Sequence, residues 1–163
     1  KEDKNNINKF ASVLIAGPLS SLLFGLVILL FFLKTSLFFL LLLGAMSTAI
    51  SVATLIPMRA GAFYTDGGRW LRIKKGGFNA QVEIAIYNLI QSNVVKGNWK
   101  SIDIEDTEIL KKDKDPINKF IGHCFASYYY RDCEKPDEFN LEKESMKILE
   151  KSVPKSFVKM IQE

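Results

Sequence analysis

The feature that most constrains this sequence is a pair of long uncharged runs near its beginning. Residues 11–33 contain no charged side chain, and neither do residues 35–58, so Lys34 alone interrupts the apolar stretch. A bilayer core of about 30 Å needs about 20 helical residues, and each run meets that length. Both runs are also too long for the core of a signal peptide. We therefore predict a transmembrane hairpin with helices over residues 11–33 and 36–57.

The charges beside the two runs predict how this hairpin is oriented. Because only Lys34, Thr35 and Ser36 separate the runs, both outer ends must lie on the same side of the bilayer. The basic residues at those outer ends are Lys1, Lys4, Lys9, Arg59, Arg69, Arg72, Lys74 and Lys75. Cytoplasmic loops carry an excess of Lys and Arg, so we expect a multi-pass integral membrane protein with both ends of this chain in the cytoplasm.

Charge divides the chain into two domains. Residues 1–78 carry nine basic and three acidic side chains, whereas residues 79–163 carry thirteen basic and fifteen acidic ones. The positive excess lies beside the apolar runs, which indicates topological anchoring in a lipid bilayer and argues against a nucleic-acid partner. We predict a membrane domain over residues 1–78 and a cytoplasmic helical tail over residues 79–163.

Apolar periodicity predicts that the tail is helical, so the expected fold class is all-α. We expect a first helix over residues 79–96, closed by Gly97, and then a linker. The apolar face expected for this helix comprises Val82, Ile86, Leu89, Ile90 and Val94.

Two further helices and the start of a third follow the linker. Asp115-Pro116 has the pattern of a helix start, and residues 133–136 form the next turn. The apolar stripe expected after Pro116 comprises Phe120, Ile121, Cys124, Phe125 and Tyr128. A helix over residues 137–151 and another opened by Pro154 complete the pattern, which resembles one tetratricopeptide-like hairpin.

The tail offers few residues for chemistry. Cys124 and Cys133 are too few and too poorly spaced for a disulfide scaffold, so we expect unpaired thiols. His123 is the only histidine, and its position beside Cys124 on a helix favours an ordinary surface or core role over a metal site. The run of tyrosines from Tyr128 to Tyr130 favours core and surface over a binding patch.

Asp66 is the residue most indicative of chemistry in the membrane domain. It is the first acid after Asp3, and two glycines follow it directly. A carboxylate next to a membrane helix is costly unless it is paired, hydrated or bound to a metal. In one interpretation, Asp66 caps the next helix and pairs with Arg69. In the other, it binds a metal.

Three short patterns together resemble the site-2 protease family of intramembrane zinc metallopeptidases. They are Ala16-Gly17-Pro18-Leu19-Ser20-Ser21, Leu55-Ile56-Pro57 and Thr65-Asp66-Gly67-Gly68-Arg69. The resemblance implies that Asp66 is a zinc ligand, that Gly67 belongs to its loop, and that Gly17 and Pro18 are structural elements near the site. It also implies a membrane-bound protein substrate cleaved near the cytoplasmic face.

One part of the family pattern is missing. The sequence contains no H-E-x-x-H motif, which would supply two zinc ligands and the general base. We therefore expect a fragment that is inactive by itself and that lacks amino-terminal transmembrane segments, with zinc bound only in the complete protein. The alternative is a non-catalytic membrane scaffold or a transport or export component that binds a cytoplasmic protein through its helical tail.

Overall fold

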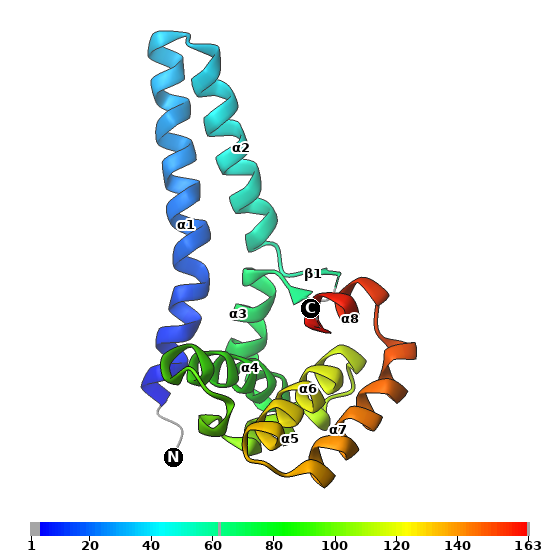
Figure 1. Ribbon diagram of the computed structural model, residues 1–163. Helices are drawn as coiled ribbons and strands as arrows, with labels where there is room; N and C mark the ends of the chain where they lie inside the picture. Colours follow the sequence, from blue (N-terminus) through cyan, green and yellow to red (C-terminus); the bar gives the residue numbers. More distant parts are fainter. Residues whose placement is uncertain (1–3, 62, 163) are drawn as a thin grey trace. The chain divides into compact units, whose positions relative to one another are not determined.

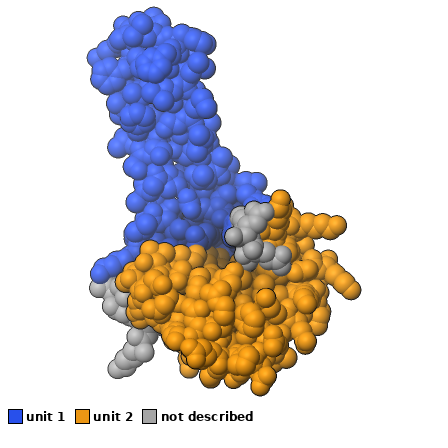
Figure 2. All heavy atoms as spheres, viewed as in Figure 1, with its two compact units in different colours: residues 1–75 blue, residues 76–163 orange. Residues whose placement is uncertain are grey.

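The chain divides into two compact units. The computed structural model describes residues 4–61 and 63–162. The first unit covers residues 1–75 and the second covers residues 76–163, so the division falls close to the expected boundary after residue 78 (Figure 2). We call them the hairpin unit and the tail unit.

Two long helices form most of the hairpin unit. α1 spans Lys4–Thr35 and α2 spans Phe38–Leu55 (Figure 1). Ser36 lies between them with a left-handed backbone (φ 53°), which allows the chain to reverse within a few residues. Both helices are long and apolar enough to cross a membrane, as the sequence predicts.

Small residues form the seam between α1 and α2. A Cβ added to Gly25 would lie 2.5 Å from Thr48 Oγ1 and 3.0 Å from the carbonyl oxygen of Gly44. Ser47 Oγ also donates a hydrogen bond of 2.9 Å to the carbonyl oxygen of Ser21. Small side chains permit such close approach, and a hydroxyl pairs with backbone oxygen across the seam. The seam therefore accounts for Gly44, Ser47 and Thr48 in the second apolar run.

A short β-hairpin and a helix follow α2. Strands β1 (Arg59–Ala60) and β2 (Phe63–Tyr64) pair antiparallel, with Arg59 opposite Tyr64. The expected all-α class therefore needs a minor correction. Gly61 has φ 64°, which lets the chain turn tightly enough for these strands to pair.

Helix α3 packs against the first half of α1. It spans Asp66–Lys75. Ala11, Leu14 and Ile73 form a buried cluster, and Phe10 and Trp70 pack against it. This cluster fixes α3, and with it Asp66 at the start of the helix, relative to α1.

The tail unit is built from helices joined by short turns. Its elements are α4 (Gly77–Lys96), η1 (Trp99–Ser101), α5 (Ile104–Lys111), α6 (Pro116–Asp132), α7 (Pro136–Leu149), η2 (Glu150–Ser152) and α8 (Lys155–Gln162). Asp115 caps α6 by accepting a hydrogen bond of 3.0 Å from Ile117 N, which confirms the predicted helix start. Phe120 is fully buried and meets Phe157 of α8 edge-on at 6.3 Å. The tetratricopeptide-like resemblance stays a prediction.

Two predictions for the tail are wrong. Ile90 and Val94, which were expected on the buried face of α4, are 50% and 75% exposed. The linker after Gly97 is also largely helical, because it contains η1 and α5. Asp103 caps α5 by accepting a hydrogen bond from Glu105 N at 3.0 Å.

Helices α5 and α6 approach each other closely at a glycine. A Cβ on Gly122 would lie 2.9 Å from the carbonyl oxygen of Thr107 and 2.9 Å from Leu110 Cβ. The absence of a side chain at this position lets α5 pack on α6 at nearly backbone distance. Position 122 carried no such signal in the apolar pattern, because the pattern marks apolar faces and not close contacts.

Candidate functional site

Asp66 is the first residue of α3, directly after the β-hairpin. Its side chain is partly buried, and it makes no hydrogen bond or ion pair with any other residue that the structure describes. A carboxylate at a helix N-terminus is stabilised by the helix dipole. The start of α3 therefore sets the position of Asp66, and its carboxylate oxygens are available to a ligand.

Thr65, and not Asp66, caps α3. The hydroxyl of Thr65 donates to the carbonyl oxygen of Ile56 at 2.7 Å and accepts from the backbone N–H groups of Met58 and Gly68, both at 3.2 Å. The Thr65 N–H donates to the carbonyl oxygen of Met58 at 3.0 Å. One side chain thus ties the end of α2 to the start of α3.

The expected pairing of Asp66 with Arg69 is also absent from the described residues. The Arg69 guanidinium lies over the Phe10 ring, 5.4 Å from its centroid. The interpretation in which Asp66 caps the helix and pairs with Arg69 therefore does not describe this loop. The sequence carried a signal for the true cap, since Thr is a preferred N-cap residue, but Asp is preferred there as well and stands next to it.

Gly67 makes the closest backbone approach in the hairpin unit. A Cβ at this position would lie 1.9 Å from the carbonyl oxygen of Leu55, the last residue of α2. Gly68 is less constrained, because its Cβ would meet its nearest atom, the Met58 carbonyl oxygen, at 3.1 Å. Gly67 therefore allows the start of α3 to touch the end of α2, which places Asp66 next to that helix end.

Gly17 and Pro18 lie inside α1, the helix on which α3 packs. Pro18 is buried, whereas Gly17 is exposed, and a Cβ on Gly17 would meet no atom within 4 Å. Packing among the described residues therefore gives no reason for a glycine at position 17. Gly17, Pro18, Asp66 and Gly67 all belong to the hairpin unit, and a site that includes Gly17 and Pro18 stays a prediction.

The residues present do not by themselves make a zinc site. In residues 4–61 and 63–162 no three His, Cys, Asp or Glu side chains are grouped so that they could hold a metal ion. Asp66 could supply a single carboxylate ligand, whereas a catalytic zinc needs three protein ligands. No catalytic step follows from this donor set alone.

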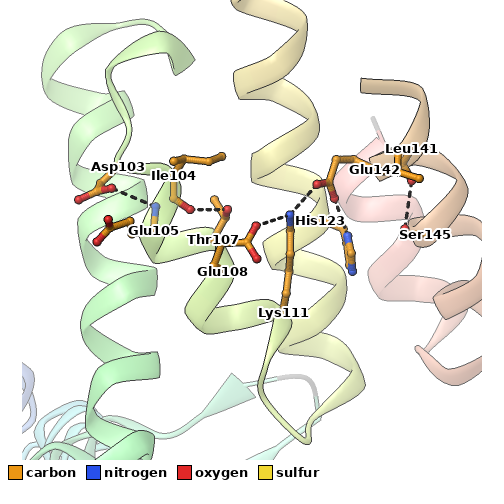
Figure 3. Close-up of polar contacts among 10 residues, drawn as sticks. All are labelled: Asp103, Ile104, Glu105, Thr107, Glu108, Lys111, His123, Leu141, Glu142 and Ser145. Carbon is orange, nitrogen blue, oxygen red and sulfur yellow. Dashed lines mark hydrogen bonds and ion pairs between the residues drawn. The ribbon is translucent and has the colours of Figure 1, made fainter. Parts of the chain in front are cut away.

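A second polar cluster occupies the tail unit, between α5, α6 and α7 (Figure 3). Glu142 Oε1 lies 2.5 Å from Lys111 Nζ, and Glu142 Oε2 lies 2.5 Å from His123 Nδ1. Lys111 also reaches Glu108 Oε1 at 2.8 Å. Because a carboxylate only accepts hydrogen bonds, His123 donates from Nδ1. These four residues form what we call the Glu142 cluster.

Burial and charge act against each other in the Glu142 cluster. Burial favours the neutral form of Glu142, but hydrogen bonds from His123 and Lys111 and the positive charge of Lys111 leave its pKa below the usual value. Burial likewise disfavours the charged form of Lys111, but its bonds to Glu108 and Glu142 leave its pKa raised. Both groups are therefore ionised over the physiological range. Their ion pair joins α5 to α7, and the hydrogen bond from His123 adds α6.

His123, Cys124 and Cys133 are not brought together as metal ligands. His123 is bound to Glu142, whereas Cys124 is buried and Cys133 ends α6. Burial raises the pKa of the Cys124 thiol, and the thiol contacts Tyr128. Cys124 is therefore a protonated core residue, and both cysteines are free thiols.

The tyrosine run is divided among different neighbours. Tyr128 stacks on Trp99 at 5.0 Å, and Arg131 lies over the Tyr128 ring at 5.3 Å. Tyr129 and Tyr130 meet each other edge-on at 5.4 Å. Burial, together with the neighbouring Cys124, raises the pKa of Tyr128 to about 12. This agrees with the expectation of mixed core and surface roles.

No protein-family model matches this chain, and comparisons with curated proteins and with solved structures gave no match either.

Proposed function

We propose that this chain is part of a site-2 protease-like intramembrane zinc metallopeptidase in which Asp66 supplies one carboxylate ligand. The substrate class is a membrane-bound protein cleaved near the cytoplasmic face. The remaining ligands and the general base would come from an H-E-x-x-H segment, which this sequence does not contain.

The observation that carries the proposal is the way Asp66 is held. Its neighbours Thr65 and Gly67 tie the start of α3 to the end of α2 through hydrogen bonds and a close backbone contact. The carboxylate oxygens of Asp66 make no hydrogen bond or ion pair within the described part of the chain. A metal ligand needs a well-held backbone and available donor atoms, and these contacts support that role for Asp66.

The outer surface of α2 supports a further part of the proposal. Ala45, Ala49 and Ala53 lie on one exposed face of α2, spaced four residues apart. Small residues on a membrane helix let another helix approach closely. Together with the open space around Gly17, this face fits additional transmembrane helices, and an H-E-x-x-H helix would be one of them.

The test uses the protein expressed from its full reading frame. Asp66→Ala should lower zinc content and abolish cleavage of a model transmembrane substrate, because it removes one of three ligands. Loss of an outer hydrogen-bond partner already costs about 10–100-fold in metal affinity, and loss of a ligand should cost at least that much. Asp103→Ala is the matched control, since it removes a capping carboxylate from the tail unit.

Two results would contradict the proposal. One is a full reading frame that encodes no H-E-x-x-H segment. The other is wild-type zinc content and cleavage in Asp66→Ala. A fall in both properties in the Asp103→Ala control would also remove the support, because it would trace the loss to general instability.

The second candidate is a non-catalytic membrane protein whose tail binds a cytoplasmic protein. Leu141 and Ile148 favour it, because they lie two turns apart on one face of α7 and are 63% and 73% exposed. Such a face suits a partner helix. A reading frame without H-E-x-x-H, together with loss of a cytoplasmic partner in Leu141→Ser/Ile148→Ser, would favour this candidate over the protease.

A further inference from the structure

Basic side chains gather at one end of the hairpin unit. They are Lys9, Arg59, Arg69, Arg72, Lys74 and Lys75, and we call them the basic rim. Within residues 9–75 the single acid is Asp66, and the remaining cation, Lys34, lies at the turn between α1 and α2. Along this stretch of the sequence the cations therefore clearly outnumber the acids.

Tertiary contacts hold the rim together across three elements. Arg69 lies over the Phe10 ring, and Arg59 and Arg72 lie over the Tyr64 ring at 5.7 and 4.4 Å from its centroid. The buried cluster of Ala11, Leu14 and Ile73 joins α3 to α1 beneath them. The cations of α1, β1 and α3 thus form one surface, although 50 residues separate Lys9 from Arg59 in the sequence.

Like charges held together repel each other unless anions neutralise them. Lys9, Lys74 and Lys75 are exposed, so anions can reach them from outside. Exposed apolar side chains, Met58 at 51% and Phe63 at 53%, accompany the cations. Tyr64 and Trp70 add aromatic rings of the kind that is enriched at membrane interfaces.

We propose that the basic rim binds the phosphate-containing headgroups of anionic phospholipids. Clusters of four to eight Lys and Arg directly beside a membrane helix attract anionic lipid. The exposed apolar residues would lie at the same depth, beside the start of the acyl chains. This inference requires that α1 and α2 lie in a bilayer, and it does not depend on zinc or on Asp66.

Tryptophan quenching by brominated lipids tests the proposal on the full chain. The chain contains two tryptophans, so Trp99→Phe leaves Trp70, which packs at the rim, as the single reporter. The protein is reconstituted into vesicles of phosphatidylglycerol and phosphatidylcholine in equal amounts, with bromine on the chains of one lipid or the other. We expect brominated phosphatidylglycerol to quench Trp70 at least about twofold more strongly, because each rim cation attracts anionic lipid.

Variants with matched charge locate the effect. Lys9→Gln/Lys74→Gln/Lys75→Gln should move the ratio of the two quenching strengths clearly toward one, because it removes half of the rim cations. The control, Lys112→Gln/Lys114→Gln/Lys147→Gln, removes the same charge from exposed positions of the tail unit and should keep the preference. Raising the salt concentration should weaken the preference, because salt screens exposed charges.

Several outcomes would overturn the proposal. Equal quenching by both lipids in the parent protein would show that the rim does not select anionic headgroups. A preference abolished by inorganic phosphate at constant ionic strength would assign the rim to a soluble phosphate ligand. The parent protein in detergent could instead bind duplex DNA. If it does, if the rim variant does not, and if no lipid preference is seen, the basic rim would be assigned to nucleic acid. Asp66→Ala should keep the quenching ratio, which separates this proposal from the protease.

Discussion

Glu142 offers the sharpest test of the packing in the tail unit. It is 7% exposed, and its two oxygens accept hydrogen bonds from Lys111 and His123, each at 2.5 Å. The substitution Glu142→Gln keeps the shape and one acceptor oxygen but removes the charge. Lys111, whose side chain is 12% exposed, would then keep only Glu108, whose side chain is 49% exposed, as its ionic partner.

The expected loss follows from these contacts. Removing one partner of a buried ion pair costs about 3–5 kcal/mol, and a hydrogen bond to a charged group contributes about 1.5–3 kcal/mol. Lys111 retains Glu108 as a partner, and the introduced glutamine would retain one acceptor oxygen. We therefore expect Glu142→Gln to lower the free energy of unfolding by about 2 kcal/mol, within the range for a hydrogen bond to a charged group. Glu144→Gln is the control, because Glu144 is exposed on the same helix and its loss should change the unfolding free energy by less than about 0.5 kcal/mol.

The effect should depend on pH in a defined direction. The pKa of Glu142 is lower in the folded protein, so its contribution is complete above the unfolded value of about 4.3. It is lost as the pH falls through the folded pKa, which lies lower still. The pKa of Lys111 is raised on folding, so its contribution is present below the unfolded value and is lost as the pH rises through the folded pKa. The difference between wild type and Glu142→Gln should therefore be constant near neutral pH and shrink at both extremes.

Trp99 provides the measurement, since it stacks on Phe125 and Tyr128 of α6. Denaturant unfolding of the full chain in detergent is followed by Trp99 emission in a Trp70→Phe background. A double-mutant cycle with Lys111→Met isolates the pair, because coupled neighbours deviate from additivity. If Glu142→Gln matches Glu144→Gln, or if the difference is the same at pH 3 and pH 7, the reasoning about this ion pair is wrong.

Three further predictions concern the hairpin unit. Gly67→Ala should lower the melting temperature in detergent, since the new Cβ would overlap a backbone oxygen and overpacking costs about 1–3 kcal/mol. Gly17→Ala has open space around it and should leave the melting temperature unchanged or raise it. A lower melting temperature for Gly17→Ala than for Gly67→Ala would refute the packing argument. Thr65→Ala should destabilise the contact between α2 and α3 by about 1–2 kcal/mol, because it removes the cap of α3. Thr65→Ser keeps the hydroxyl and should restore most of that stability. Equal melting temperatures of wild type, Thr65→Ala and Thr65→Ser would contradict the capping role. In vesicles, a cysteine at Lys34 should react only from the side opposite to one at Lys75, and labelling of both from the same side would exclude the hairpin topology.

The sequence by itself determined the helical hairpin. An uncharged run of bilayer length has few alternatives, because every backbone group must be hydrogen-bonded locally when water is absent. It also determined the start of α6, since Asp115 and Pro116 act within a single turn. The sequence also marks Asp66 as a candidate ligand, because an unpaired acid beside a membrane-spanning run costs free energy whatever the fold of the following residues.

Other features depended on residues that are distant in the sequence. The helix after Gly97 was missed because the buried Leu110 and Thr107 gain their partners from α6, where Gly122 permits close contact. The apolar pattern of α4 predicted a wider buried face than the structure has, because Ile90 continues the pattern but is 50% exposed. Apolar spacing reports which residues favour burial, but only packing decides which of them are buried.

The candidate sites show the same division. Asp66 was found from sequence, but the joint that holds it depends on Gly67 touching the end of α2 and on Thr65 bonding across the β-hairpin. In the Glu142 cluster, 31 residues separate Lys111 from Glu142, and no local pattern links them. Ion pairs and close backbone contacts are decided by distances in space, so only the tertiary structure could place them, whereas the length of an apolar run is a property of the chain alone.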